Sequence, residues 1–280
     1  MRHISPEQIT ETISRLCLEA NFDLPSDVLD ALEKARDNEE LENAKEILNQ
    51  LLQNAHIAEC ERIALCQDCG AVVVYVKLGR DIHLTGDLYT AINEGVRQAY
   101  TSGWLRKSMI REPLHRNTNT GDNTPAIIHL HLVDGDNLEI TVAPKGGGSE
   151  NMSALWMLTP AEGREGVINR VVERIRQAGG KPCPPLILGI GIGGTADKAM
   201  LLAKEALIRS VDSQNPDPAI AQLEYEILNA VNAIGVGPMG LGGKTTALAV
   251  HIEQFPCHIA SLPVALNVQC HAARHATAII

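Results

Sequence analysis

The residues with the most chemical potential in this chain are cysteines placed in turns and beside prolines. Cys66-Gln67-Asp68-Cys69-Gly70 puts two thiols, an amide and a carboxylate on one turn, immediately before an apolar run. Such side chains can point into a common cleft at the entrance of a strand, and a polar turn with a structural cysteine is the simple alternative. Cys183 stands between two prolines, whose restricted backbone holds the thiol as rigidly as a metal ligand requires. Cys257 and Cys270 follow near the C-terminus, each beside a histidine.

A run of three glycines, Gly146 to Gly148, follows Lys145 and precedes a predicted helical turn. Consecutive glycines lose much conformational entropy on folding, so their presence needs a reason. Bare backbone N–H groups at the start of a helix bind anions, and Lys145 adds a positive charge. We therefore expect this loop to bind an anion rather than to form a plain flexible connection.

Two other glycine-rich segments imitate nucleotide-binding motifs without meeting their requirements. Gly189 to Gly194 follows a strand and precedes a helix, but no second strand ending in an acidic residue comes after it. Gly242-Gly243-Lys244-Thr245 resembles a P-loop, whose spacing needs glycine where Pro238 stands. We expect both runs to let the backbone pack closely around a buried site.

The composition is that of a globular protein with an acidic surface. The chain has 280 residues, and hydrophobic residues make up 45% of them, enough for a sizeable core. A formal charge of −10 argues against nucleic acid and anionic membranes as partners. No apolar run approaches the roughly 20 residues of a membrane helix, and the N-terminus lacks a signal peptide's apolar segment, so we expect a cytoplasmic protein. Its seven cysteines should stay reduced there, with Cys17 buried on a helix face.

Helical and strand patterns mix along the chain without strict alternation, which predicts a mixed α/β fold. The first sixty residues are helical and open with the capping box Ser5-Pro6-Glu7-Gln8. Apolar spacing predicts helices over 37–53, 88–100, 166–178, 196–208 and 223–234, and strands over 71–78, 185–190, 247–252 and 263–268. We expect an N-terminal helical lobe, residues 1–58, packed on a mixed-sheet core, residues 59–280, in a single domain spanning 1–280.

A β-hairpin is predicted between residues 126–133 and 138–143, joined by Asp134-Gly135-Asp136-Asn137. Its first strand alternates, which places Leu130 and Leu132 on the buried face. His129 and His131 would then lie on the outer face.

Six of these segments, in order, resemble the α subunit of class I (iron–sulfur) fumarate hydratases, which form one family with L-tartrate dehydratases. The similarity covers nearly the whole chain. The segments are CQDCG at 66–70, NTGDNTPA at 119–126, PKGGGSEN at 144–151, CPP at 183–185, GLGGKTTALAVHIE at 240–253 and HIASLPVALNVQCHAARHA at 258–276. The 59–280 core would accordingly be an iron–sulfur cluster domain.

The resemblance implies a [4Fe-4S] cluster bound by three cysteines, which correspond to Cys66, Cys183 and Cys270. One iron then lacks a protein ligand and can act as a Lewis acid. This sequence departs from the family at Cys69, where threonine is usual, so the member of the Cys66 and Cys69 pair that binds iron is open.

The family's other roles carry over residue by residue. Gln67 and Asp68 resemble substrate and proton-relay groups, and Arg106 resembles an arginine that binds a substrate carboxylate. Gly147 resembles the substrate-contacting backbone of the glycine loop, next to Lys145. His258, twelve residues before Cys270, resembles the general acid toward the leaving hydroxyl.

The implied activity is the interconversion of fumarate and (S)-malate, a hydro-lyase reaction of the tricarboxylic acid cycle. The family places the base and further cations in a separate β-type chain, so activity would need that β subunit, in an α2β2 assembly. L-tartrate dehydratase is the nearest alternative, although NTGDNTP and KGGGSENMS follow the fumarase pattern. A mesaconate hydratase remains an option because one methyl group is weakly discriminated. A zinc-stabilised binding module, using Cys66 and Cys69 with C-terminal cysteine or histidine ligands, is the alternative from another class.

Overall fold

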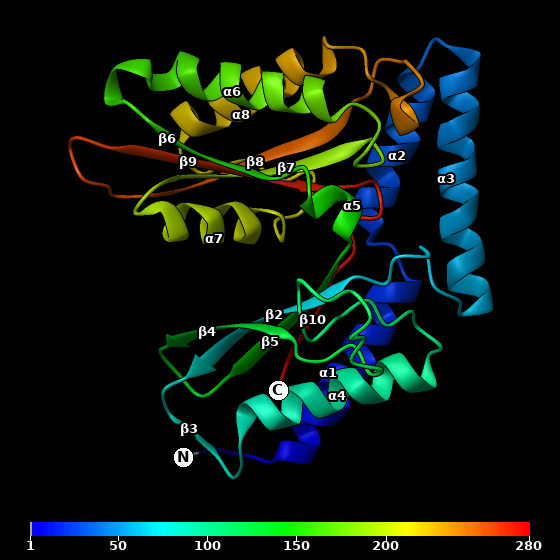
Figure 1. The fold of residues 1–280 in the computed structure, drawn as a ribbon, viewed down its shortest axis with the longest axis vertical. Helices are drawn as coiled ribbons and strands as arrows, with labels where there is room; N and C mark the ends of the chain where they lie inside the picture. The colour runs from blue at the N-terminus through cyan, green and yellow to red at the C-terminus, as the bar shows by residue number, and fades with distance from the viewer. Residues whose placement is uncertain (1) are drawn as a thin grey trace. The chain divides into compact units, whose positions relative to one another are not determined.

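The computed structural model describes residues 2–280, which divide into two compact units. The first unit comprises residues up to Leu24, residues 54–147 and residues 274–280, and the second comprises residues 25–53 and 148–273. Each unit contains one four-stranded sheet with helices packed on it (Figure 1). The predicted mixed α/β class is therefore confirmed.

The first unit is built on a sheet with the strand order β10-β5-β2-β4. Its helices α1 and α4 lie together on one face of that sheet (Figure 1), and their apolar side chains share one core with β2 and β5. Strand β4 is parallel to β2, whereas β5 is antiparallel to both β2 and β10. The elements of this unit are β1 (Arg2–Ile4), α1 (Pro6–Phe22), β2 (Ala71–Gly79), β3 (Ile82–Leu84), α4 (Leu88–Ser102), β4 (Ile127–Val133), β5 (Leu138–Lys145) and β10 (Ala276–Ile279).

The second unit is built on a sheet with the strand order β6-β9-β7-β8. Figure 1 shows α6 and α8 on one face of this sheet and α7 on the other. Strand β8 is parallel to β7, and β9 is antiparallel to its neighbours β7 and β6. The main elements are α2 (Ser26–Asn38), β6 (Ala154–Leu158), α6 (Gly163–Ala178), β7 (Leu186–Gly193), α7 (Ala196–Ala206), α8 (Pro218–Asn232), β8 (Ala247–Phe255) and β9 (Leu262–Gln269).

Four shorter or shared elements complete the chain. Helix α3 (Glu42–Glu61) contributes residues to both units, and the single turn α5 (Gly147–Glu150) spans the unit boundary after Gly147. The 3₁₀ turns η1 (Pro160–Glu162) and η2 (Pro238–Gly240) lie in the second unit. Helices α1 and α2 belong to different units, and the predicted N-terminal lobe over residues 1–58 stays a prediction.

Local sequence signals account for several of these elements. The predicted capping box forms at α1: Ser5 accepts the backbone N–H of Gln8, and the Gln8 side chain accepts that of Ser5. The apolar run of β2 is buried as predicted, with Val72, Val74 and Val76 each 0% exposed. Cys17 is likewise fully buried on α1. No helix of residues 2–280 is long and apolar enough to cross a membrane.

The predicted hairpin of 126–133 with 138–143 is wrong. Strand β2 lies between β4 and β5, so β4 pairs with β2 in parallel instead of with the strand that follows it. The predicted faces also fail, since Leu130 is 44% and Leu132 73% exposed. His129 stacks on Tyr75 of β2, with ring centroids 5.3 Å apart. The turn sequence between β4 and β5 is typical of a hairpin, but β2, which is distant in sequence, pairs with both strands instead.

The helix predicted over 37–53 begins later, at Glu42. The carboxylate of Glu39 accepts the backbone N–H groups of Glu40 and Leu41, at 2.9 and 3.2 Å. Glu39 is only 3% exposed. Because its buried carboxylate binds the two backbone N–H groups that follow it, the chain is not helical between α2 and α3. Apolar spacing alone does not reveal a buried carboxylate that captures the backbone.

Candidate functional site

The Cys66–Gly70 turn of the first unit leads directly into β2 and carries a tightly held carboxylate. Asp68 Oδ1 accepts the N–H of Gly70 at 3.0 Å, and Oδ2 accepts the N–H of Gly147 at 2.8 Å. Gly70 has φ +72°, and a Cβ there would lie 2.7 Å from the backbone nitrogen of Lys145. The predicted residues Asp68 and Gly147 are therefore brought together, with Lys145 beside the same turn.

The glycine loop thus has an anion partner within the chain itself. The N–H of Gly147 donates to the carboxylate of Asp68. The sequence predicted an anion at this loop but did not indicate that a side chain of the same chain would be that anion. Lys145, the last residue of β5, is 8% exposed and pairs in register with Ala71. Substrate binding by Gly147 and Lys145 stays a prediction.

Cys69 and Arg106 are linked on the buried side of the turn. Arg106 donates its backbone N–H to Cys69 Sγ at 3.2 Å, and the Cys69 thiol donates to the carbonyl of Cys66 at 3.7 Å. Burial raises the pKa of the Cys69 thiol, and the N–H of Arg106 partly offsets that rise. A threonine hydroxyl could make the same two hydrogen bonds, which gives Cys69 a structural role.

Two predicted substrate groups are exposed beside this turn. The side chains of Gln67 and Arg106 are both accessible, and Arg106 Nη1 donates to the carbonyl of Gln67 at 3.5 Å. An exposed guanidinium next to an exposed amide can bind a carboxylate. The structure therefore brings together the predicted groups of the first unit: Gln67, Asp68, Arg106, Lys145 and Gly147.

Asn123 connects two loops around the Cys66–Gly70 turn. From the sequence, its segment NTGDNTPA was predicted to form a turn, and no role was predicted for Asn123 itself. It is fully buried, with φ +66°. Its Oδ1 accepts the N–H groups of Ser108 and Met109, at 2.7 and 3.2 Å, and its Nδ2 donates to the carbonyl of Gly70 at 3.0 Å. Asn123 thereby ties the Arg106 loop to the cysteine turn. An asparagine within a glycine-rich turn was the available signal, but turns use asparagine commonly.

Cys183 and Cys270 belong to the second unit and lie on adjoining loops. Cys183 precedes β7 and Cys270 follows β9, and these antiparallel strands place both residues at the same end of the sheet. The carbonyl of Cys183 accepts the N–H of His271 at 3.3 Å. Cys183 has φ +57° and donates its N–H to Gly180 at 3.0 Å, so its loop is firmly held.

The chemistry of the three predicted ligands fits an iron–sulfur cluster. Cys66, Cys183 and Cys270 are half-buried thiols outside any disulfide. The N–H of Asp68 donates to Cys66 Sγ at 3.4 Å, and the amide of Gln269 donates to Cys270 Sγ at 3.8 Å. Hydrogen bonds to sulfur are common around such clusters. Within residues 2–280 no three histidine, cysteine, aspartate or glutamate side chains are grouped to hold a metal ion. The three-cysteine set therefore stays a prediction.

The structure does not bring His258 to the cysteine pair of the second unit. His258 lies in the connection before β9, whereas Cys270 follows that strand. Eight residues of extended strand separate the two positions by roughly 25 Å. His258 is exposed, and its Nδ1 accepts the N–H of Ala260 at 3.2 Å. The role of His258 as general acid stays a prediction from the resemblance, since strand β9 keeps this residue away from Cys270 within the chain.

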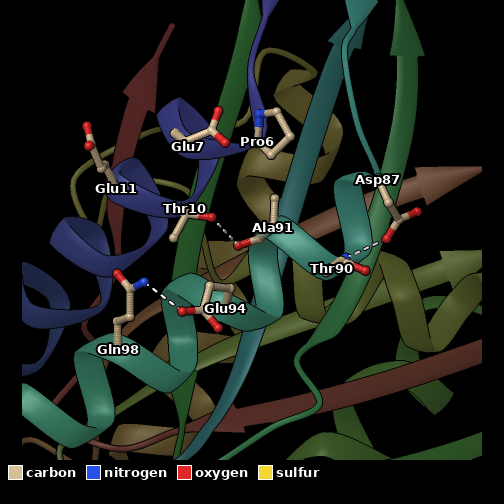
Figure 2. Close-up of a pocket in the computed structure, with 9 residues that line it drawn as sticks. All are labelled: Pro6, Glu7, Thr10, Glu11, Asp87, Thr90, Ala91, Glu94 and Gln98. Carbon is tan, nitrogen blue, oxygen red and sulfur yellow. Dashed lines mark hydrogen bonds between the residues drawn. The ribbon is translucent and has the colours of Figure 1, made fainter.

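A cavity of about 460 Å³ lies elsewhere in the first unit, between α1 and α4 (Figure 2). Four carboxylates line it, those of Glu7, Glu11, Asp87 and Glu94, so it would repel a dianionic substrate. Asp87 already caps the N–H of Thr90 at 2.7 Å. None of the predicted site residues is among its lining.

The whole chain matches proteins of one family. The model of the family described as fumarate hydratase (Fumerase) matches residues 10–279. A Methanocaldococcus jannaschii protein, provisionally named L(+)-tartrate dehydratase subunit alpha, is 45% identical over 274 residues, 96% of this chain and 96% of that protein. L(+)-tartrate dehydratase subunit alpha of Escherichia coli O157:H7 is 30% identical over 275 residues, 98% of this chain and 91% of that protein. The same subunit of Escherichia coli strain UTI89 is 31% identical over 272 residues, 96% of this chain and 90% of that protein.

These matches indicate a hydro-lyase of the fumarase and tartrate dehydratase type. The chain belongs to the fumarate hydratase (Fumerase) family, which confirms the resemblance noted in its motifs. The relatives are named as alpha subunits of L(+)-tartrate dehydratase, so the names favour the tartrate alternative over the fumarate activity expected first.

Proposed function

We propose that this chain is the α subunit of an iron–sulfur hydro-lyase that removes water from a four-carbon hydroxy-dicarboxylate, with L-tartrate as the first candidate substrate. The observation that carries the proposal is the near full-length match to relatives named L(+)-tartrate dehydratase subunit alpha. Fumarate hydration is the second candidate, favoured by the NTGDNTP and KGGGSENMS segments. Both reactions add or remove water beside a carboxylate, so one site architecture serves either.

Cys66, Cys183 and Cys270 would hold a [4Fe-4S] cluster, whose iron without a protein ligand supplies Lewis-acid chemistry to the departing hydroxyl. Asp68 contributes a carboxylate whose two oxygens are oriented by the N–H groups of Gly70 and Gly147. An oriented carboxylate can accept and return a proton without reorganising during the reaction. Asp68 is therefore the proton-relay group of the proposal.

Substrate binding falls to the exposed polar groups around the same turn. Arg106 offers a guanidinium for one substrate carboxylate, and Gln67 offers an amide for a hydroxyl or carboxylate oxygen. Lys145 adds positive charge at the end of β5. The general acid is not assigned to His258 of the same chain, because β9 separates that residue from Cys270.

A separate β subunit is part of the proposal, because the relatives are named as alpha subunits. The reaction increases negative charge on an already dianionic substrate and needs several converging cations. This acidic chain supplies few of them at the turn, so further cations and the base are assigned to the partner. An α2β2 stoichiometry is the simplest closed arrangement of such pairs.

The test is a substrate panel on the anaerobically assembled α and β chains. Initial rates with L-tartrate, (S)-malate, fumarate and mesaconate would be compared as kcat/KM. We expect L-tartrate to have the highest value. A preference for malate and fumarate would establish the second candidate, and activity on none of the four would contradict the proposal.

The zinc-module alternative is tested on the same preparation by its metal content. We expect iron and acid-labile sulfide in equal amounts and little zinc. One zinc per chain without sulfide would favour the module instead.

A further inference from the structure

Every backbone carbonyl of the Cys66–Gly70 turn accepts a hydrogen bond from a side chain. The thiol of Cys69 donates to the first carbonyl and Arg106 to the second. The carbonyls of Asp68, Cys69 and Gly70 accept from Arg274, Tyr100 and Asn123, respectively. Apart from the Cys69 thiol, the side chains that hold this turn come from other parts of the first unit.

Arg274 differs from the other donors because it is a buried charge. It is 5% exposed, and its Nη2 donates to the Asp68 carbonyl. Its Nε and Nη1 are buried and have no hydrogen-bond partner within residues 2–280. Burying a guanidinium with two unmade hydrogen bonds is a costly way to hold one carbonyl. Tyr100 and Asn123 hold the neighbouring carbonyls with neutral groups, so stability alone does not explain an arginine at this position.

We propose that Arg274 is a positioning residue for Asp68. It holds the Asp68 backbone from the buried side of the turn, and this keeps the carboxylate against the N–H groups of Gly70 and Gly147. A charge-assisted hydrogen bond is roughly twice as strong as a neutral one, and a planar guanidinium restrains its direction as well. The inference rests on the proposed function, in which Asp68 relays a proton. Without Arg274 the peptide group after Asp68 can rotate, and the carboxylate then leaves its two donors.

The first test uses the chain without its cluster and follows hydrogen exchange of single amides. The amide protons of Gly70 and Gly147 report the position of the Asp68 carboxylate, because both are donated to it. The amide proton of Val74, in the β2 ladder, reports opening of the unit as a whole. In Arg274→Met we expect the two glycine amides to exchange roughly tenfold faster or more, relative to Val74, from loss of one charge-assisted hydrogen bond.

Two further variants make this test specific. Arg274→Lys keeps the charge and should restore part of the protection. Arg80→Met removes a surface arginine of the same unit, paired with Asp134 at 3.1 Å, and should change neither glycine amide. Equal acceleration of all amides in Arg274→Met would reduce the residue to a structural role and overturn the proposal. Unchanged exchange at Gly70 and Gly147 would overturn it as well.

A kinetic arm separates this inference from the proposed function. In the assembled α and β chains, Arg274→Met should lower kcat at least tenfold with a smaller change in KM, and Arg274→Lys should fall between. A rise in KM alone would contradict positioning of the proton relay. A wild type without hydro-lyase activity would overturn the proposed function, and the exchange experiment would still decide the role of Arg274.

Discussion

The local surroundings of the seven thiols divide them into distinct groups. Three thiols are half-buried, those of Cys66, Cys183 and Cys270. Two are buried, Cys17 and Cys69, and two are exposed, Cys60 and Cys257. Burial raises the pKa of the Cys17 thiol, which makes it a poor ligand and a poor nucleophile. The ligand set stays a prediction, and the three thiols named for it share one kind of environment.

The first prediction follows from this division. Cys66→Ser, Cys183→Ser and Cys270→Ser should each prevent cluster assembly, because a serine hydroxyl is a poor ligand for cluster iron. Iron, acid-labile sulfide and visible absorption after anaerobic reconstitution measure the outcome. Cys257→Ser, which changes an exposed thiol that bonds the Ser261 carbonyl at 3.3 Å, is the matched control. Full cluster absorption in Cys183→Ser would refute the ligand assignment.

Cys69 supports a second prediction at the same scale. Cys69→Thr should keep both the cluster and the activity, since the hydroxyl can replace the thiol in both hydrogen bonds. Cys69→Val, of similar size, cannot make either bond and should lower the unfolding free energy by about 1–3 kcal/mol. Iron loss in Cys69→Thr would instead identify Cys69 as a ligand.

His251 on β8 gives a third prediction, on pH. The residue is 1% exposed, both ring nitrogens are buried without a partner within residues 2–280, and burial first, then Arg209, lowers its pKa to about 4. Its ordinary pKa is 6.5, so between pH 6.5 and 4 the unfolded chain binds a proton that the folded chain does not. The unfolding free energy should therefore fall as the pH falls through this window, by about 3 kcal/mol in total.

Chemical denaturation at pH 7 and pH 5 measures the effect. His251→Leu should show a smaller fall between the two pH values than the wild type. His83→Gln, which changes an exposed histidine, should behave as the wild type does. An equal fall in all three proteins would show that His251 does not carry this dependence.

At the scale of elements, β7 and α7 approach so closely that only glycine fits between them. A Cβ on Gly189 would lie 2.0 Å from the carbonyl oxygen of Ala203, and one on Gly191 would lie 2.0 Å from that of Ala199. The glycine run therefore permits close backbone packing as expected, but it packs strand β7 against helix α7 and not around a buried site. The other run contacts carboxylates: Lys244 donates its N–H to Glu39 at 2.8 Å and its ammonium to Glu40 at 2.6 Å.

The fourth prediction tests the β7 contact. Gly191→Ala should lower the unfolding free energy by about 3 kcal/mol or more, because α7 must move away from the sheet. Gly235→Ala adds a methyl group where no atom lies within 4 Å, although at φ +74°. It should cost only about 1–2 kcal/mol, the ordinary penalty of that conformation. Equal losses measured by denaturant unfolding would argue against the close approach.

At the scale of the whole molecule, the fifth prediction follows from the net negative charge of the chain, which is unfavourable for a dianionic substrate. The chain carries a formal charge of −10. Besides Arg274, which is buried on the Asp68 carbonyl, the turn around Asp68 offers Arg106 and Lys145 as cations. A dianionic substrate needs more positive charge than these two provide. The reconstituted α chain alone should therefore show less than about 1% of the activity of the α and β mixture, a difference of nearly 3 kcal/mol in transition-state stabilisation. Rates that do not change when the β chain is added would contradict the two-subunit proposal.

The sequence by itself determined what depends on neighbouring residues. The capping box of α1, the buried strand β2, the helix α4 and the membership in a hydro-lyase family follow from local spacing and from ordered motifs. Asp68 and Gly147 were also predicted, from the motifs that contain them, to belong to one site, and the structure joins them by a hydrogen bond. The signal for each element lies in one short stretch of chain, and that for the family lies in six short segments taken in order.

Tertiary structure alone decided what depends on contacts distant in sequence. Strand β2 inserts between β4 and β5 and cancels the predicted hairpin, and the Glu39 carboxylate breaks a helix that apolar spacing continues. Asn123 and Arg274 reach the Cys66–Gly70 turn from 53 and 206 residues away along the chain. His258, close to Cys270 in sequence, is set apart from it by a strand. Which hydrogen bonds and strand pairs form depends on the free energy of the whole fold, including contacts distant in sequence. A local sequence pattern does not contain that information.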